Sequence, residues 1–426
     1  MNARLPLVPI ENRRIRIIGA TVFNGVSAAP MKQGEVEYEK GVITYVGPKR
    51  RMTTSNRTDT ITIDAAGGYL LPGFIDVHIH ASMPNDTSPE QIQWWFPEEE
   101  AFATADSLRL TLEAGVTSAR DLSGLTPGYR NAIAQGRILG PRMHLAISML
   151  SPTGGHADPK APNGELPVYA RRATTPGWSI VDTDEEIIKT VRRLDSMGAD
   201  VIKVCTTGGL STRFDSPMSL GVPRQHISLI RRTVATLGRQ PIAAHAQSRE
   251  GVAEAIHGGA STIEHAFGLD DALIEEILRD NITVVPTLTV LNWTSETLSD
   301  EKRLLKSKRR DVGMHMIAHA IAAGVTIATG TDSGLSPHGR NLLELGYLVD
   351  AGMSPLQAIA AGTINGAKAM GLDDRLGSLE IGKQADMVLS SVDPMTRIHE
   401  YSDPSNIRVV WQAGRAVKDL DGIANH

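Results

Sequence analysis

The chain has 426 residues, a length that predicts two or three domains of ~150 residues, or one large barrel with a small partner domain. It carries 43 Lys and Arg residues against 48 Asp and Glu residues, and this slight acidic excess argues against a nucleic-acid-binding protein. The single cysteine, Cys205, excludes an intramolecular disulfide framework and a zinc site built from several cysteines. We find no apolar run long enough to span a membrane and no apolar core of a signal peptide, so we expect a cytoplasmic protein.

Both ends of the chain favour β-structure. Short β-branched or glycine-bounded runs predict strands at Ile15–Gly19, Gly34–Glu39, Val42–Gly47 and Ile61–Asp64, and again at Ala385–Ser391 and Ile407–Gln412. Because these runs flank one long middle region, we expect a single small β-sandwich built from both termini. Its two parts are predicted at 1–70 and 376–426, with a separate domain at 71–375 between them.

The middle region alternates short strand-like runs with longer helical patterns. Gly or Asn follows the helical stretches, which is the usual signal for a helix end. Eight strands are expected, at Phe74–His80, Thr117–Asp121, Met143–Ser148, Val201–Cys205, Ile242–His245, Ser261–His265, Thr283–Pro286 and Thr326–Thr329. Eight β/α units in about 300 residues predict a (β/α)8 TIM barrel, which is an α/β fold. A doubly wound sheet would alternate in the same way, but no Gly-x-Gly-x-x-Gly fingerprint follows the first strand.

Polar residues lie at the carboxyl ends of several predicted strands, where a TIM barrel carries its active site. His78 and His80 end the first strand two residues apart, so both imidazoles face the same side. The fourth, fifth, sixth and eighth strands contribute one candidate each, namely Lys203, His245, His265 and Asp332. We therefore expect all six side chains to converge on one face of the barrel.

This set of side chains predicts a metal centre. Imidazole and carboxylate groups together suit Zn²⁺, Fe²⁺ or Mn²⁺. Lys203 is the unusual member, because an ammonium group is repelled by a divalent cation. It is expected either to be deprotonated or to be carbamylated by CO₂, and a carbamate could bridge two metal ions. Taken singly, each residue has an ordinary explanation, since a lone histidine near a strand end is commonly a hydrogen-bonded core group.

Several stretches resemble the amidohydrolase superfamily, and together they span almost the whole chain. They are LPGFIDVHIH (71–80), VIKVCTTGG (201–209), AAHA (243–246), STIEHA (261–266), TGTDSG (329–334) and the tail GSLEIGKQADMVL (377–389). The set resembles the branch that holds imidazolonepropionase-like proteins, Xaa-Pro or Xaa-Arg dipeptidases, ochratoxin-hydrolysing amidohydrolases and aryl-urea or carbamate hydrolases. The resemblance implies two divalent metal ions, with zinc expected and manganese or iron as alternatives.

The resemblance also implies a role for each candidate ligand. His78 and His80 would bind the more buried metal ion together with Asp332. His245 and His265 would bind the second ion.

By the same resemblance, a CO₂-derived carbamate on Lys203 and a hydroxide would bridge the pair. The hydroxide would attack the scissile carbonyl, with Asp332 as general base and proton shuttle. His156, in the loop after the third strand, is expected to hydrogen-bond the substrate carbonyl, although a loop-packing role is the alternative.

Loops at the same face supply the candidates for substrate contacts. Trp95 and Trp293 follow the first and seventh strands, and they indicate either a partly aromatic pocket or subunit contacts. Arg213 could clamp a substrate carboxylate, or it could pair with Asp215. His338, six residues after Asp332, is a further candidate at the barrel mouth.

Together these features predict a metal-dependent hydrolase that cleaves an amide bond of an N-acyl or N-aroyl amino acid or a small dipeptide. An ochratoxin-type amide of phenylalanine is a plausible substrate of this carboxypeptidase-like kind. The alternative is an aryl carbamate or urea hydrolase on the same site. A non-catalytic scaffold would have lost ligands, and most deaminases of the superfamily use one metal without a lysine. We expect a small-molecule substrate, no nucleic-acid or membrane partner, and a homo-oligomer.

Overall fold

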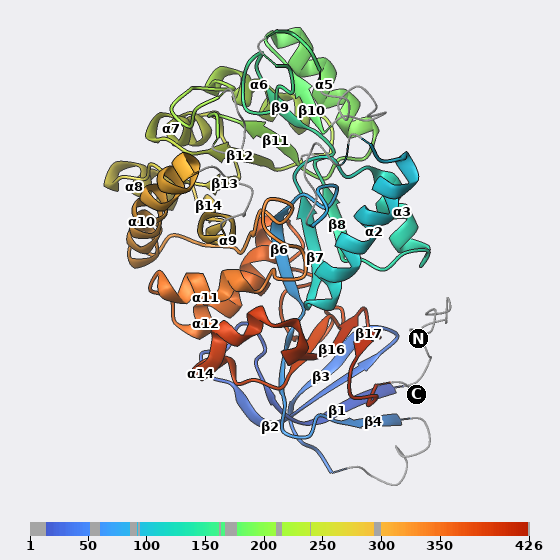
Figure 1. Cartoon of the computed structure of the whole chain (residues 1–426). Coiled ribbons are helices and arrows are strands. Elements are labelled where there is room, and N and C mark those ends of the chain that lie inside the picture. The colour runs from blue at the N-terminus through green and yellow to red at the C-terminus, as the bar shows by residue number, and fades with distance from the viewer. Residues whose placement is uncertain are drawn as a thin grey trace.

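A computed structural model of the chain describes residues 14–51, 60–85, 92, 94–161, 163–166, 177–209, 215–238, 240–293 and 300–424. Figure 1 shows parallel strands ringed by helices, set on a β-sheet in which N-terminal strands (blue) lie beside C-terminal ones (red). The chain is an α/β protein with a (β/α)8 barrel and a β-domain from both terminal regions, as the sequence predicts.

The β-domain is one mixed eight-stranded sheet. Its strands are β1 (Arg14–Val22), β2 (Met31–Glu39), β3 (Val42–Pro48), β4 (Thr60–Asp64), β5 (Tyr69–Pro72), β15 (Met387–Ser390), β16 (Ile407–Gln412) and β17 (Arg415–Asp419). The order is β17-β16-β15-β5-β1-β2-β3, with β4 paired to β1. β5 and β15 are antiparallel neighbours, with Leu71 opposite Val388, so this pair joins the two halves. Side chains such as Ile17, Val36 and Trp411 share one buried core. The expected β-sandwich is therefore formed by a single continuous sheet that surrounds this core.

The barrel strands are parallel and follow the predicted order. They are β6 (Phe74–Ile79), β7 (Val116–Asp121), β8 (Arg142–Leu145), β9 (Met149–Ser151), β11 (Ile202–Cys205), β12 (Ile242–Ala246), β13 (Thr262–His265) and β14 (Thr283–Val285), with β10 (Trp178–Ile180) beside β9. The predicted third strand is split into β8 and β9 at Ile147, whose φ of 67° interrupts an extended chain. β8 pairs with β7 and β9 pairs with β11, so the split strand still bridges its two neighbours.

The predicted eighth strand, 326–329, is not a regular strand but still occupies the eighth position. Val284 N donates to Thr326 O (2.9 Å), and Ala328 N donates to Val284 O (3.0 Å). On the other side, Val77 N donates to Thr329 O (2.9 Å). The segment is therefore hydrogen-bonded both to β14 and to β6, and this arrangement carries Asp332 to the end of β6.

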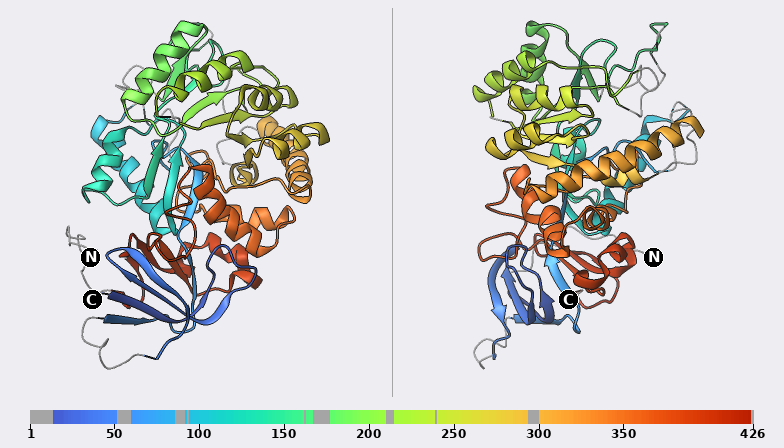
Figure 2. Two further views of the ribbon diagram at one scale, coloured as in Figure 1. Left: turned by 180° about the vertical axis from the view of Figure 1, so that it is seen from behind. Right: turned by 90° about the vertical axis from the view of Figure 1, so that its left-hand side faces the viewer.

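Helices cover the outside of the barrel (Figure 2), where α10 crosses the surface as a long helix. The helices are α2 (Pro97–Glu113), α3 (Pro127–Ala134), α5 (Asp184–Ser196), α6 (Arg224–Ala235), α7 (Arg249–Gly258), α8 (Asp271–Arg279), α9 (Leu288–Asn292), α10 (Asp300–Ala322), α11 (Leu343–Asp350), α12 (Pro355–Ala360), α13 (Gly366–Ala369) and α14 (Pro394–Arg397). The described part of the chain also contains a π-helical turn (Ala361–Asn365) and 3-10 turns at Ile398–Ser402 and Pro404–Asn406.

The sequence of α5 illustrates why these helices form and pack. Thr183 caps its first turn through a hydrogen bond from Glu186 N, and Glu186 returns the contact in a capping box. Ile187, Val191 and Leu194, spaced three and four residues apart, form its buried face against the barrel. Among the described residues, none of the helices is both long and apolar enough to cross a membrane.

Candidate metal and catalytic centre

The six predicted side chains lie in the barrel strands or follow them, and all six are buried. They are His78 in β6, His80 directly after it, Lys203 in β11, His245 in β12, His265 at the end of β13 and Asp332 in the segment that follows the eighth position. His265 and Asp332 have positive φ angles of 67° and 55°. Backbone in this region is strained for residues other than glycine, and such strain is concentrated at functional sites.

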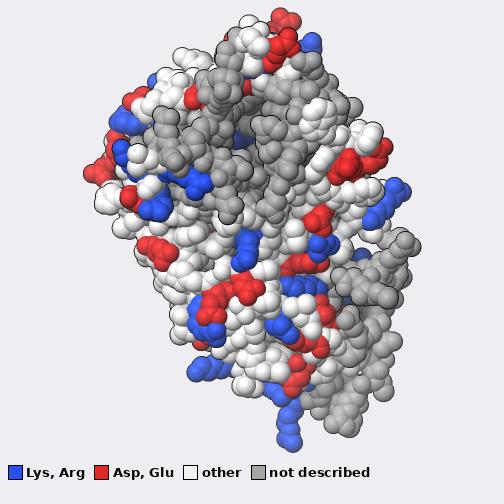
Figure 3. Space-filling view, in the orientation of Figure 1, with Lys and Arg blue, Asp and Glu red and all other residues white. Residues whose placement is uncertain are grey.

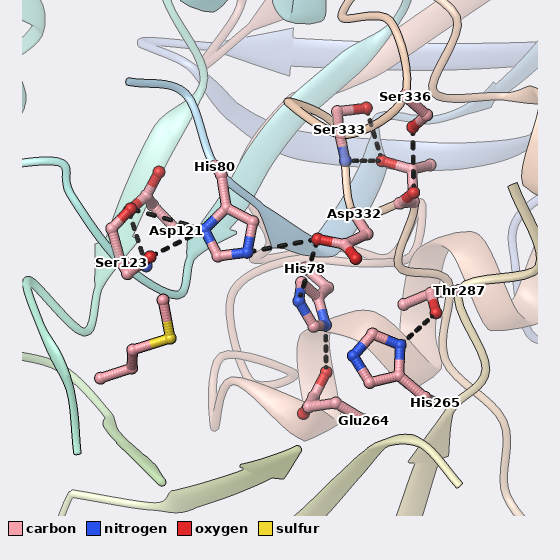
Figure 4. Close-up of polar contacts among 12 residues, drawn as sticks. His78, His80, Asp121, Ser123, Glu264, His265, Thr287, Asp332, Ser333 and Ser336 are labelled. Carbon is pink, nitrogen blue, oxygen red and sulfur yellow. Dashed lines mark hydrogen bonds and ion pairs between the residues drawn. The ribbon is translucent and has the colours of Figure 1, made fainter. Parts of the chain in front are cut away.

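The Asp332 carboxylate lies between two histidines (Figure 4). Its Oδ1 is 3.2 Å from His80 Nε2 and 3.5 Å from His78 Nε2. Ligand atoms of His78, His265 and Asp332 all lie within 4.8 Å of one another, so these three could hold one metal ion. His245 adjoins them, with its ring centroid 4.6 Å from that of His265.

Each of the four histidines uses one ring nitrogen in a hydrogen bond within the protein. His78 Nδ1 contacts Glu264 Oε2 (2.9 Å), and His80 Nδ1 contacts Ser123 Oγ (2.9 Å). These bonds leave Nε2 of both rings directed at Asp332.

The other two histidines show the same pattern. His265 Nδ1 contacts Thr287 Oγ1 (2.7 Å), and His245 Nε2 donates to Gly208 O (3.0 Å). Metal-ligating histidines characteristically anchor one ring nitrogen in this way and use the other as ligand. The histidine set therefore fits a metal centre.

Lys203 has the properties expected of a lysine that does not remain an ordinary ammonium group. Its side chain is buried, and its Nζ has no hydrogen-bond partner among the described residues. Burial lowers the pKa of Lys203, and the nearby Glu264 and Asp332 carboxylates only partly oppose that shift. A desolvated amine with a lowered pKa is the form that reacts with CO₂, so the environment fits a carbamate as well as a neutral amine.

The electrostatics of the site favour neutral imidazoles at His78, His245 and His265 and an ionised carboxylate at Asp332. Burial lowers the pKa of His78 and His245 well below the usual range and that of His265 to about 4. Burial also opposes ionisation of Asp332, but His78 and His80 outweigh it and hold its pKa below the usual range. For His80, burial lowers the pKa but Asp332 raises it more. Neutral imidazole and ionised carboxylate are the metal-binding forms of these groups.

His156 lies against this centre and is held there by its neighbours. Its ring stacks on that of His245, with centroids 4.2 Å apart and planes 22° from parallel. Its Nδ1 contacts Asp215 Oδ2 (2.9 Å), and the same oxygen accepts from Gly209 N (2.9 Å). A Cβ atom on residue 209 would come 2.2 Å from His156 Cε1, so Gly209 makes room for the ring.

His338 is hydrogen-bonded within the protein. It is buried, with Nε2 3.0 Å from Met83 O and Nδ1 3.5 Å from Thr111 Oγ1. It also borders a cavity of about 340 Å³ between α2 and β17, away from the histidine cluster. Both ring nitrogens have partners inside the protein, and through Met83 the ring contacts the loop after β6, so a substrate contact by His338 stays a prediction.

Of the remaining predicted substrate contacts, Trp95 and Trp293 are partly exposed. Trp95 is half-buried before α2, and Trp293 is 38% exposed at the end of α9. Arg213 lies outside the described residues. The face in Figure 3 is hollowed above the strands and carries basic and acidic side chains interspersed.

Four buried acidic residues support the site and were not singled out from the sequence, namely Asp76, Asp121, Asp215 and Glu264. Asp121 accepts hydrogen bonds from the backbone of Ala81 and Ser123, next to His80. Asp121 ends β7, so the strand-end rule that identified the histidines would have included it. Glu264 precedes His265, and a carboxylate inside an apolar strand was a usable signal because burying a charge requires a partner.

Most of the chain is similar to known proteins. The pattern of the family described as "Amidohydrolase family" matches residues 69–417. Ochratoxinase from Aspergillus niger is 30% identical over 438 aligned residues, which cover 97% of this chain and 89% of that protein. The solved structure of A. niger ochratoxinase superposes with a TM-score of 0.84 at 26% identity, over 96% of each chain. A Xaa-Pro dipeptidase with bound methionine in the active site superposes with a TM-score of 0.85 at 25% identity, over 95% of this chain and 100% of that one.

Proposed function

The chain belongs to the amidohydrolase family and is a hydrolase of C–N bonds, and from that premise we propose that it cleaves the amide bond of an N-acyl or N-aroyl amino acid, or of a small dipeptide. The ochratoxinase relative and the dipeptidase-like structure support this choice of substrate class. An amide of a C-terminal apolar residue, such as phenylalanine, is the proposed preferred form.

We propose that the site holds two divalent metal ions, with zinc as the first candidate and manganese or iron as alternatives. The residues that would hold them are His78, His80, His245, His265, Asp332 and a carbamylated Lys203. A bound metal pair supplies an acidified water and polarises a carbonyl group. The observation that carries the proposal is that each of the four buried histidine rings holds one nitrogen in a hydrogen bond within the protein. The second nitrogen of each ring is then the atom that would bind metal.

The chain's own groups have proposed tasks around that chemistry. Asp332, held ionised by the histidines, takes a proton from the attacking water and passes it to the leaving nitrogen. His156 binds the scissile carbonyl oxygen through the ring edge that does not face Asp215. Burial of the centre excludes bulk water, which strengthens both interactions.

A substrate with a free carboxylate needs a cation near the centre. Arg213 remains one proposed cation for binding the substrate carboxylate. Lys306 on α10 is a second candidate for the same role, and it lies among the residues that the structure describes. Lys306 Nζ donates to the carbonyl oxygen of Trp293. Burial lowers the pKa of Lys306, and the Asp332 carboxylate opposes that shift. We propose that Lys306 and Trp293 contact the carboxylate and the apolar side chain of the released amino acid.

The test is a competition assay with mass-spectrometric detection. N-benzoyl-phenylalanine and an N-aryl carbamate of similar size are offered together, before and after the protein is treated with a chelator and reconstituted with zinc. Release of phenylalanine ahead of the aniline, lost on chelation and restored by metal, supports the proposal. Release of the aniline first assigns the site to carbamate or urea hydrolysis, and turnover that survives chelation overturns the metal centre.

A further inference from the structure

A chain of buried polar groups adjoins the candidate metal centre. It runs from Arg120 on β7 through Glu264 on β13 to His78 on β6, and Arg120 and Glu264 have no exposed surface. β13 is not a neighbour of β6 or β7 in either sheet, so Glu264 reaches both strands across the barrel interior. Figure 4 shows the contact between Glu264 and His78 on the side of the ring opposite Asp332.

The partners of Glu264 determine its charge and the direction of its hydrogen bond to His78. Its Oε1 accepts from Arg120 Nη2 (2.8 Å) and from Thr262 Oγ1 (2.5 Å). Its Oε2 is 2.9 Å from His78 Nδ1. Arginine stays protonated, so Glu264 is a carboxylate and can only accept. His78 must then carry its proton on Nδ1.

Arg120 is itself fixed in place. Its Nε donates to Val77 O (2.6 Å), one residue before His78. Its Nη1 is buried without a partner among the described residues, so Glu264 is the group that compensates the guanidinium charge. The two charged groups therefore hold each other and the ring of His78 in one orientation.

We propose that Glu264, held by Arg120, is a positioning residue that fixes the Nδ1–H tautomer of His78 and thereby sets the affinity of this chain for its metal ion. A neutral ring protonated on Nδ1 presents the lone pair of Nε2, which is the nitrogen facing Asp332. Removing such an outer partner characteristically weakens metal binding by 10–100-fold. The competing explanation is that Arg120 and Glu264 form a core ion pair that affects only folding stability.

Metal affinity of the apoprotein, measured by competition with a chromophoric chelator, separates the two explanations. The test variant is Glu264→Gln, which removes the charge and keeps the size. The matched control is Glu35→Gln, because Glu35 is an equally buried carboxylate paired with Arg16 and Arg50 in the terminal sheet. We expect Glu264→Gln to weaken zinc binding about 10–100-fold, and Glu35→Gln to leave it within about twofold while lowering the thermal midpoint comparably.

Unchanged zinc affinity in folded Glu264→Gln overturns the proposal. If that variant does not fold, nitrogen-15 NMR of the wild-type apoprotein with labelled histidine decides, since the ring nitrogens report the tautomer directly. The His78 resonance is assigned by its loss in His78→Gln. A proton on Nδ1 is expected, and a proton on Nε2 overturns the proposal. Failure of the wild-type protein to bind zinc would contradict the proposed metal centre instead, so the two failures are distinguishable.

Discussion

The imidazole of His156 lies stacked on the imidazole of His245, with ring centroids 4.2 Å apart. His156 lies in the loop after β9 and His245 lies in β12, and Asp215 holds the ring of His156 through a 2.9 Å contact to Nδ1. A substrate that approaches His245 therefore meets His156 at the same position. This relationship links the proposed carbonyl-binding residue directly to the proposed metal ligands.

Replacing Asp215 by Asn is expected to lower kcat/KM by about 100-fold, because small misplacements of a catalytic group have effects of this size. Metal content is expected to stay unchanged, since within the described part of the chain Asp215 makes no hydrogen bond to any of the six candidate ligands. Asp158→Asn is the matched control, because Asp158 holds the same loop through Gly154 N but not the ring. Normal steady-state kinetics for Asp215→Asn would remove the positioning role of Asp215.

Lys203→Ala is expected to abolish two-metal occupancy and activity together, because the proposed carbamate is the group shared by both ions. Metal content measured by mass spectrometry checks the result. Cys205→Ala is the control, since Cys205 is buried two residues away and its sulfur contacts Met149 at 3.8 Å. Two metal ions retained in Lys203→Ala would refute the bridging role.

Asp332→Asn is expected to reduce kcat by at least about 100-fold, the usual contribution of a general base. Its effect on the affinity for a non-hydrolysable substrate analogue is expected to be much smaller. Both are measured on protein whose metal content is determined in the same sample. Near-native turnover in the fully loaded variant would exclude Asp332 as the base.

Lys306→Met is expected to raise KM for N-benzoyl-phenylalanine about 10–100-fold, the range for a lost charge-assisted hydrogen bond. The same variant should hydrolyse N-benzoyl-phenylalaninamide as well as wild type does, because that substrate has no carboxylate. Lys308→Met, an exposed lysine on the same helix, is the control. An equal loss on both substrates would show that Lys306 does not read the carboxylate, and Arg213→Ala would then be the variant to compare.

Removing metal with a chelator is expected to lower the thermal midpoint, and adding zinc should restore it. The folded chain gathers four buried imidazoles and a carboxylate that the unfolded chain separates, so binding favours the folded state. Zinc at 1,000 times its Kd would add about 4 kcal/mol to the free energy of unfolding. Differential scanning fluorimetry measures the midpoint, and a value indifferent to both treatments would contradict a resident metal.

The amino-acid sequence by itself determined the order of the elements, the barrel and the six candidate ligands. Strands and helices can be predicted from short stretches of sequence, because the spacing of apolar residues indicates which side chains are buried. His78, Lys203 and Asp332 could be found because strand ends are visible in the sequence and a barrel brings all of them to one face. The interrupted strands at Ile147 and at 326–329 could not be predicted, since their pairing depends on how neighbouring strands twist and close.

Only the tertiary structure decided which groups support those ligands. Asp215 meets His156 from 59 residues away, and Glu264 meets His78 from 186 residues away. The contacts of His338 with Met83 and Thr111 likewise join segments that lie far apart in the sequence. Side-chain direction and hydrogen-bond partners are set by contacts between distant segments, and no local pattern encodes them.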